Sequence, residues 1–210
     1  MKQQKFGLFG LAVAGMALAL AFVTPGPVRA AISDAPEIGT AVSDFKLTDY
    51  EGKEHSLSAH KGKIVVMSFT SQQCPVSHEC EPRYAELAEK YGDKGVVFLS
   101  IDSHASTTTA EIAKYATSDN RTGKKLPYPI LKDVDNKYAD VMGAKRTPEI
   151  YIADKDGKLA YHGSIDNQKK PTDADYKNYV AAALDELLAG KPVSEPKHSA
   201  YGCGIKRKAA

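Results

Sequence analysis

The strongest constraint on the fold is an alternation of short apolar runs with segments of helical periodicity. Residues 64–69 and 96–101 are continuous apolar runs rich in β-branched side chains, which is typical of strands buried on both faces. Between them, apolar residues of the segment 81–91 recur at helical spacing, and Gly92 is expected to end that helix. This alternation predicts an α/β fold in which helices cover both faces of a sheet.

Two hairpins are expected to extend this sheet. Residues 44–48 and 54–57 flank a turn at 50–53, and residues 149–153 and 158–162 flank an Asp-Lys-Asp-Gly turn at 154–157. The first hairpin precedes the first buried strand, so it is an N-terminal addition to the α/β unit. The other expected elements are a helix over 108–116, a strand over 128–131, a short helix over 136–142 and a closing helix over 173–189.

The first 30 residues have the pattern of a secretory signal peptide. Lys2 and Lys5 precede an apolar stretch over 6–23, and Val28-Arg29-Ala30 ends in the small-x-small pattern of a cleavage site. We therefore expect a signal peptide over 1–30, a domain over 31–190, a flexible tail over 191–210, and a periplasmic or secreted protein. The stretch is also just long enough to span a bilayer, so contact with a membrane is expected only if the segment stays uncleaved.

Cys74 lies at the predicted junction between a buried strand and a helix. A thiol at a helix N-terminus meets unsatisfied N–H donors and the positive end of the helix dipole, which stabilise the thiolate. The chain has 3 cysteines, an odd number, so at least one thiol of an exported chain stays unpaired or pairs with another molecule. The pattern predicts a reactive Cys74, and the alternative is a small buried apolar side chain.

The charge and the motifs exclude several classes of function. The formal net charge is +2, and no basic patch is interleaved with aromatic residues, so nucleic acid is not an expected partner. No haem motif, phosphate-binding loop or dinucleotide fingerprint is present, and no cofactor is expected.

The order of elements around Cys74-Pro75 and Thr147-Pro148 resembles the thioredoxin fold. More narrowly, the chain resembles the peroxiredoxin-like branch of the redoxin superfamily, which includes alkyl hydroperoxide reductase and thiol-specific antioxidant. The resemblance covers residues 45–206 and implies a central mixed sheet, a thiol-dependent oxidoreductase and Cys74 as the attacking thiol. It rests most on the segments GAKRTPEIY (143–151), GKLAYHGSID (157–166) and YGCGIK (201–206).

The resemblance also assigns roles near the nucleophile. Ser71 keeps the hydroxyl that peroxiredoxins place three residues before the cysteine, whereas Met67 replaces their proline and Ser77 replaces the second thiol of a Cys-x-x-Cys motif. Arg146 stands where a cation faces the thiolate or a peroxide oxygen, and its alternative is a surface arginine. Thr147 and Pro148 are expected to form a cis-proline loop whose backbone pairs with an extended substrate chain.

The sequence leaves two candidates for the thiol that resolves oxidised Cys74. Cys80 follows Cys74 by six residues, which on a helix is a rotation of about 240° and a rise of about 9 Å. A disulfide needs α-carbons within about 7 Å, so this pair forms only if the first turn unwinds. Pro75 and Pro82 each lack a backbone donor, and the regular helix is therefore expected to begin near residue 81.

Cys203, in the tail, is the second candidate for the resolving thiol. We expect Cys80 to be used, because its distance from Cys74 is bounded by the helix start, whereas nothing in the sequence locates the tail. A buried core position is the alternative for Cys80. The expected substrate is a peroxide or a protein disulfide, and the expected reductant is an external thiol or a thioredoxin-like protein.

A metal carrier is the alternative class of function. Cys74, His78 and Cys80 combine soft sulfur with imidazole, a set that suits Cu(I) or Zn. His162, His198 and Cys203 are possible further ligands. The spacing Cys-x3-His-x-Cys matches no zinc signature, so no metal site is assigned from the sequence.

Overall fold

The computed structural model describes residue 1 and residues 33–117 and 123–209. Its centre is a seven-stranded sheet with the order β2-β1-β5-β4-β3-β7-β8. β3 pairs in parallel with β4 and antiparallel with β7, so the sheet is mixed and the predicted thioredoxin-like α/β fold is confirmed. The strands are β1 Leu47–Asp49, β2 Glu54–His55, β3 Ile64–Thr70, β4 Val96–Asp102, β5 Ile130–Lys132, β6 Arg146–Thr147, β7 Glu149–Ala153, β8 Leu159–Gly163 and β9 Cys203–Gly204.

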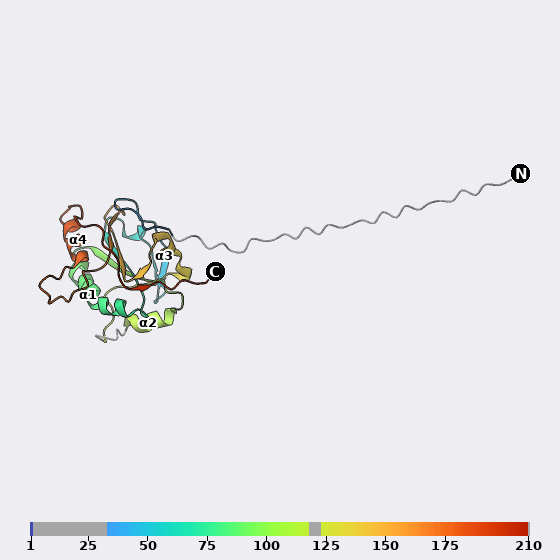
Figure 1. Cartoon of the computed structure of the whole chain (residues 1–210), viewed down its shortest axis with the longest axis horizontal. Helices are drawn as coiled ribbons and strands as arrows, with labels where there is room; N and C mark the ends of the chain where they lie inside the picture. The colour runs from blue at the N-terminus through green and yellow to red at the C-terminus, as the bar shows by residue number, and fades with distance from the viewer. Residues whose placement is uncertain (2–32, 118–122, 210) are drawn as a thin grey trace.

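Helices cover both faces of this sheet (Figure 1). α1 Pro75–Gly92, α2 Thr109–Thr117 and α4 Tyr179–Leu188 pack into one apolar cluster, and α3 Lys137–Met142 packs into a second cluster. Two short 3-10 helices, η1 Ser58–His60 and η2 Val134–Asn136, lie in the connections. The predicted layers are therefore present, with β1 and β2 forming the added hairpin at one edge.

Strand β3 shows why a continuous apolar run predicts a strand that is buried on both faces. Ile64 and Val66 lie in the first cluster, whereas Val65, Met67 and Phe69 lie in the second. Successive side chains of a strand point to opposite faces, so a strand covered on both faces needs apolar residues at every position. Full burial of each such side chain contributes about 1.5–3 kcal/mol.

The first helix begins six residues earlier than expected. α1 starts at Pro75, with Cys74 as its N-cap, rather than near residue 81. Pro75 occupies the first turn, where the missing N–H has no intrahelical partner to lose. Pro82 lies inside the helix, and the helix continues past it because residues such as Cys80 and Tyr84 pack into the core on either side.

The closing helix is shorter than the expected segment 173–189. α4 begins at Tyr179, where the Asn178 side chain accepts a hydrogen bond from Ala181 N at 2.9 Å. Asn178 is thus a side-chain N-cap, which satisfies one of the free N–H groups of the first turn. Tyr176, which falls within the expected helix, lies outside α4, and its hydroxyl donates to Asp166 Oδ2 at 3.4 Å.

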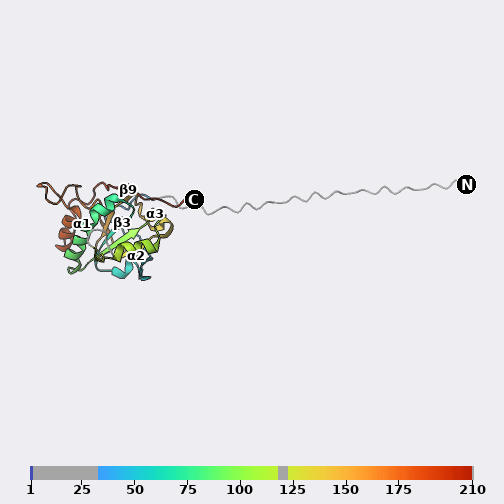
Figure 2. The ribbon, with the colours of Figure 1, turned by 90° about the horizontal axis from the view of Figure 1, so that it is seen from below.

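The segment after Gly190, expected to be a flexible tail, lies along the domain over its described part. His162 N donates to Pro196 O at 2.9 Å, and Lys208 N donates to Asn136 Oδ1 at 2.8 Å. Between them, β9 pairs antiparallel with β6, at one end of the central sheet (Figure 2). We call residues 196–208 the strap. Its composition did not predict this docking, since the contacts join distant parts of the chain.

No helix of the described residues is long and apolar enough to cross a membrane. The predicted signal peptide over 1–30 lies outside these residues, apart from residue 1.

Candidate active site

Cys74 sits between the end of β3 and the first turn of α1. A tight turn carries it there, in which Cys74 N donates to Ser71 O at 3.0 Å. Ser71 is buried, and its hydroxyl accepts a hydrogen bond from Gln73 N at 3.1 Å, so this side chain shapes the turn. Cys74 is only 2% exposed.

The sulfur of Cys74 contacts Thr147 and Cys203, both outside α1. Its Sγ donates to Thr147 O at 3.0 Å, and it lies 2.6 Å from Cys203 Sγ. Both cysteines are free thiols, and Cys203 is half-buried. Cys203 reaches this position because it pairs with Thr147 in the β6–β9 ladder. The structure therefore places the tail cysteine, 129 positions away in the sequence, directly against Cys74.

The surroundings of Cys74 favour its thiolate. Burial raises the pKa of Cys74, but its hydrogen bonds with Cys203, with Thr147 and with the Ser77 backbone N–H outweigh burial and lower the pKa to about 7, from an ordinary 9.0. The pKa of Cys203 is raised, first by its hydrogen bond with Cys74 and second by burial. The pair thus consists of one thiol that ionises near neutral pH and one that keeps its proton.

Cys80 lies elsewhere on α1. Its Sγ accepts a hydrogen bond from Arg83 Nη2 at 3.2 Å and lies 3.4 Å from the Tyr201 hydroxyl. Burial raises its pKa. The preference for Cys80 as the resolving thiol assumed an unwound first turn, and the structure shows this turn folded, with Pro75 already in the helix.

The cis-proline loop is present opposite Cys74. The Thr147–Pro148 peptide bond is cis, as expected. Arg146, by contrast, is exposed, and its Nη1 donates to Gly202 O of the strap at 3.3 Å. The guanidinium therefore contacts the strap. Among the described residues, no hydrogen bond joins Arg146 to Cys74.

A buried carboxylate that sequence reasoning missed supports this loop. Glu149 Oε2 accepts hydrogen bonds from Lys145 N at 2.7 Å and Arg146 N at 2.8 Å, and Oε1 accepts from His162 Nε2 at 2.7 Å. Burial raises the pKa of Glu149, but the bonds from His162 and from the two N–H groups outweigh it and lower the pKa. An acidic residue at the start of an apolar strand was the available signal.

A second buried network, also missed, connects α1 to the strap. Arg83 Nε donates to Asp166 Oδ2 at 2.6 Å, and the Tyr201 hydroxyl donates to Asp166 Oδ1 at 2.8 Å. Asp166 is 1% exposed, and its buried charge is compensated by Arg83 and by hydrogen bonds from Tyr201, Tyr176 and Gln168 N.

The alternative metal site is not assembled in the part of the chain that the structure describes. No three His, Cys, Asp or Glu side chains there are grouped so as to hold a metal ion. His78 Nε2 contacts Gln72 O, His162 pairs with Glu149, and His198 stacks on Tyr179 with ring centroids 3.5 Å apart.

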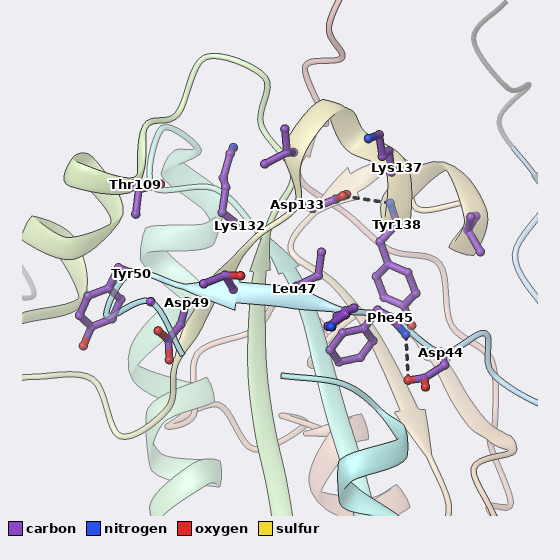
Figure 3. A pocket seen from close by; sticks show the side chains of 15 residues that line it. Asp44, Phe45, Leu47, Asp49, Tyr50, Thr109, Lys132, Asp133, Lys137 and Tyr138 are labelled. Carbon is purple, nitrogen blue, oxygen red and sulfur yellow. Dashed lines mark hydrogen bonds between the residues drawn. The ribbon is translucent and has the colours of Figure 1, made fainter. Parts of the chain in front are cut away.

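A separate pocket of about 630 Å³ lies between β1 and α3. Figure 3 shows Lys132, Tyr138 and Phe45 along its wall. None of the three cysteines lines it, so thiol chemistry belongs to the Cys74 site and not to this pocket.

The sequence of the chain matches a known protein family over more than half of its length. The model of the AhpC/TSA family matches residues 38–162. The chain belongs to the AhpC/TSA family. A thiol-disulfide oxidoreductase ResA of Bacillus anthracis is 32% identical over 123 residues, which cover 59% of this chain and 67% of the relative. As a member of this family, the protein is a thiol-dependent oxidoreductase.

Two solved structures share the fold over most of this AhpC/TSA chain. A hypothetical protein of Sinorhizobium meliloti 1021 superposes with a TM-score of 0.75 at 26% identity, covering 84% of this chain and 98% of the other. An uncharacterized conserved protein of Geobacillus kaustophilus has a TM-score of 0.71 at 30% identity, covering 83% and 94%. The family match ends at residue 162, so Cys203 lies beyond it.

Proposed function

We propose that the protein is an extracytoplasmic thiol–disulfide oxidoreductase in which Cys74 is the nucleophile and Cys203 the resolving thiol. The observation that carries this proposal is the distance of 2.6 Å between the two sulfurs, with Cys74 at the N-cap of α1. The N-terminal segment 1–30, with its signal-peptide pattern, supports the location.

The two thiols divide the reaction between them. The Cys74 thiolate attacks one sulfur of a substrate disulfide, forming a mixed disulfide and releasing the first substrate thiolate. The Cys203 thiol then loses its proton and attacks Cys74 Sγ, which forms the Cys74–Cys203 disulfide and releases the second substrate thiolate. The two protons from Cys74 and Cys203 end on the substrate thiols, and an external dithiol regenerates the enzyme.

Peptide mapping under non-reducing conditions tests this assignment. After one turnover with a protein disulfide, we expect one dominant cross-link, between Cys74 and Cys203, and free Cys80. Cys74→Ser is expected to abolish turnover, whereas Cys80→Ser is expected to retain it. A dominant Cys74–Cys80 cross-link, or turnover without Cys74, would contradict the proposal.

A further inference from the structure

The strand edge next to Cys74 is occupied by a segment of the same chain. β6 holds Thr147, whose carbonyl oxygen accepts the Cys74 thiol, and its partner in the ladder is β9. Thr147 lies opposite Cys203 and Arg146 opposite Gly204, and Ile205 N donates to Lys145 O at 3.1 Å. Cys203 is therefore presented to Cys74 on an extended strand, as a cysteine of a bound peptide would be.

The ladder restricts which residues fit beside that cysteine. A Cβ on Gly202 would lie 2.2 Å from Thr147 O, and Gly202 has φ of +127°. A Cβ on Gly204 would meet no atom within 4 Å. Two positions after the cysteine, Ile205 is only 7% exposed and belongs to the second apolar cluster. A chain paired with β6 in this way needs a small residue directly before its cysteine. It has room for any side chain directly after the cysteine, and it buries an apolar side chain at the second position after it.

The strap must leave before a second polypeptide can use this edge. With the strap in place, Cys74 is 2% exposed. The strap is anchored on both sides of β9, by Tyr201 on Asp166 before it and by Arg207 Nε on Asp140 Oδ1, at 2.7 Å, after it, whereas its pairing with β6 covers only two residue pairs. Such a short ladder is an exchangeable contact, unlike the long β3–β4 pairing of the core.

We propose that the strap is an internal competitor for the β6 edge: it occupies this edge between partners and leaves it when an extended cysteine-bearing segment of a partner protein pairs there. The inference rests on the proposed function and deepens it. A partner disulfide replaces the strap and forms the mixed disulfide with Cys74. The returning strap then delivers Cys203 to Cys74 Sγ and takes the edge from the departing partner, so that resolution and release occur together.

Trapping of the mixed disulfide tests the inference. In the full chain with Cys203→Ser, the mixed disulfide at Cys74 cannot be resolved, and its rate of formation is measured by mass spectrometry. Two probes are compared: a disulfide-linked dimer of a peptide copying residues 200–206, and 2-hydroxyethyl disulfide, which has no backbone to pair with β6. Gly202→Ala, whose Cβ would clash with Thr147 O and is expected to displace the strap, is matched with Gly204→Ala, which adds the same methyl group in open space.

We expect Gly202→Ala to accelerate the peptide probe about tenfold more than it accelerates 2-hydroxyethyl disulfide, because the apparent affinity scales with the fraction of molecules whose edge is free. Gly204→Ala should leave both rates near those of the parent. Equal acceleration of both probes, or none, overturns the inference, since the strap then merely shields the thiol or never leaves. Absence of any adduct at Cys74 instead removes the proposed function, and this inference with it.

A second pair of variants gives the same test without changing the ladder. Arg207→Gln removes the ion pair with Asp140, whereas Lys206→Gln removes a neighbouring charge whose side chain is exposed. Like Gly202→Ala, Arg207→Gln is expected to accelerate mixed-disulfide formation with the peptide probe more than with 2-hydroxyethyl disulfide. Lys206→Gln is expected to leave both rates near those of the parent. Identical behaviour of the two variants would contradict the anchoring of the strap by Arg207.

Discussion

At the scale of single residues, the reactivity of Cys74 depends on a neighbour that is remote in sequence. A helix N-terminus stabilises a thiolate, but burial of the same sulfur works against it. The Cys203 thiol shifts the balance, because its hydrogen bond with the Cys74 sulfur helps to lower the pKa of Cys74 to about 7. Cys203 is thus both the proposed resolving thiol and a cause of the reactivity of Cys74.

The pH profile of alkylation checks this dependence. We expect iodoacetamide to label Cys74 with a midpoint at pH about 7 in the parent chain. Cys203→Ala removes this hydrogen bond and is expected to raise the midpoint by about one unit. Cys203→Ser keeps a hydroxyl donor and should shift the midpoint less. The midpoint is the readout, because access to Cys74 also changes in both variants. An unchanged midpoint in Cys203→Ala would refute the role of this hydrogen bond.

At the scale of elements, the loop before β7 is the part that holds the active-site edge in place. Glu149 fixes this loop by accepting two backbone N–H groups and the His162 ring, all within 2.8 Å. The negative charge is buried, 4% exposed, and is therefore tolerated only because these donors are aimed at it. β6 and its cis proline are consequently positioned by a residue that does not touch the sulfurs.

Stability as a function of pH tests the part played by Glu149. Its folded-state pKa lies below its ordinary 4.5, so the stabilisation is complete above that value and is lost as the pH falls through the folded pKa. Between about pH 5 and about pH 3, the free energy of unfolding should fall more steeply in the parent than in Glu149→Gln. At pH 7, Glu149→Gln should lower the free energy of unfolding by about 1–3 kcal/mol, since the two backbone N–H groups and the His162 ring lose a charged acceptor. Urea unfolding measures both, and parallel pH curves would contradict the assignment.

At the scale of the whole molecule, the strap connects the last segment of the chain to both flanks of the sheet. It contacts β8 through His162, α1 through the Asp166 network, and the α3 region through Asp140 and Asn136. Oxidation of Cys74 and Cys203 would close a loop that spans most of the described domain. The redox state of this pair is therefore expected to alter the stability of the entire fold.

Comparison of the oxidised and reduced chains measures this coupling. A cross-link across a long loop restricts the unfolded state, and we expect oxidation to raise the free energy of unfolding by about 2–4 kcal/mol. The difference should vanish in Cys203→Ser and persist in Cys80→Ser. If Cys80→Ser abolished it, the disulfide would involve Cys80 instead.

The sequence by itself determined the α/β alternation and the position of Cys74. Both follow from local patterns: β3 is apolar at every position because both of its faces are covered, and Cys74 is placed by the end of that strand and the proline after it. Helix boundaries were harder to predict. The start of α1 depends on how Cys80 and Tyr84 pack, and the start of α4 on the Asn178 cap, so the expected starts at residues 81 and 173 were wrong.

Only the tertiary structure decided which thiol faces Cys74. Cys80 is near in sequence, but a regular helix carries it into the Arg83–Tyr201 network. Cys203 is 129 positions away and is brought back by two strand pairs, a buried Ile205 and an ion pair at Arg207. These contacts join segments with no periodic relation to one another. Strand pairing at an edge depends on which backbone is left unpaired when the sheet has formed, and no local pattern in the tail carries that information.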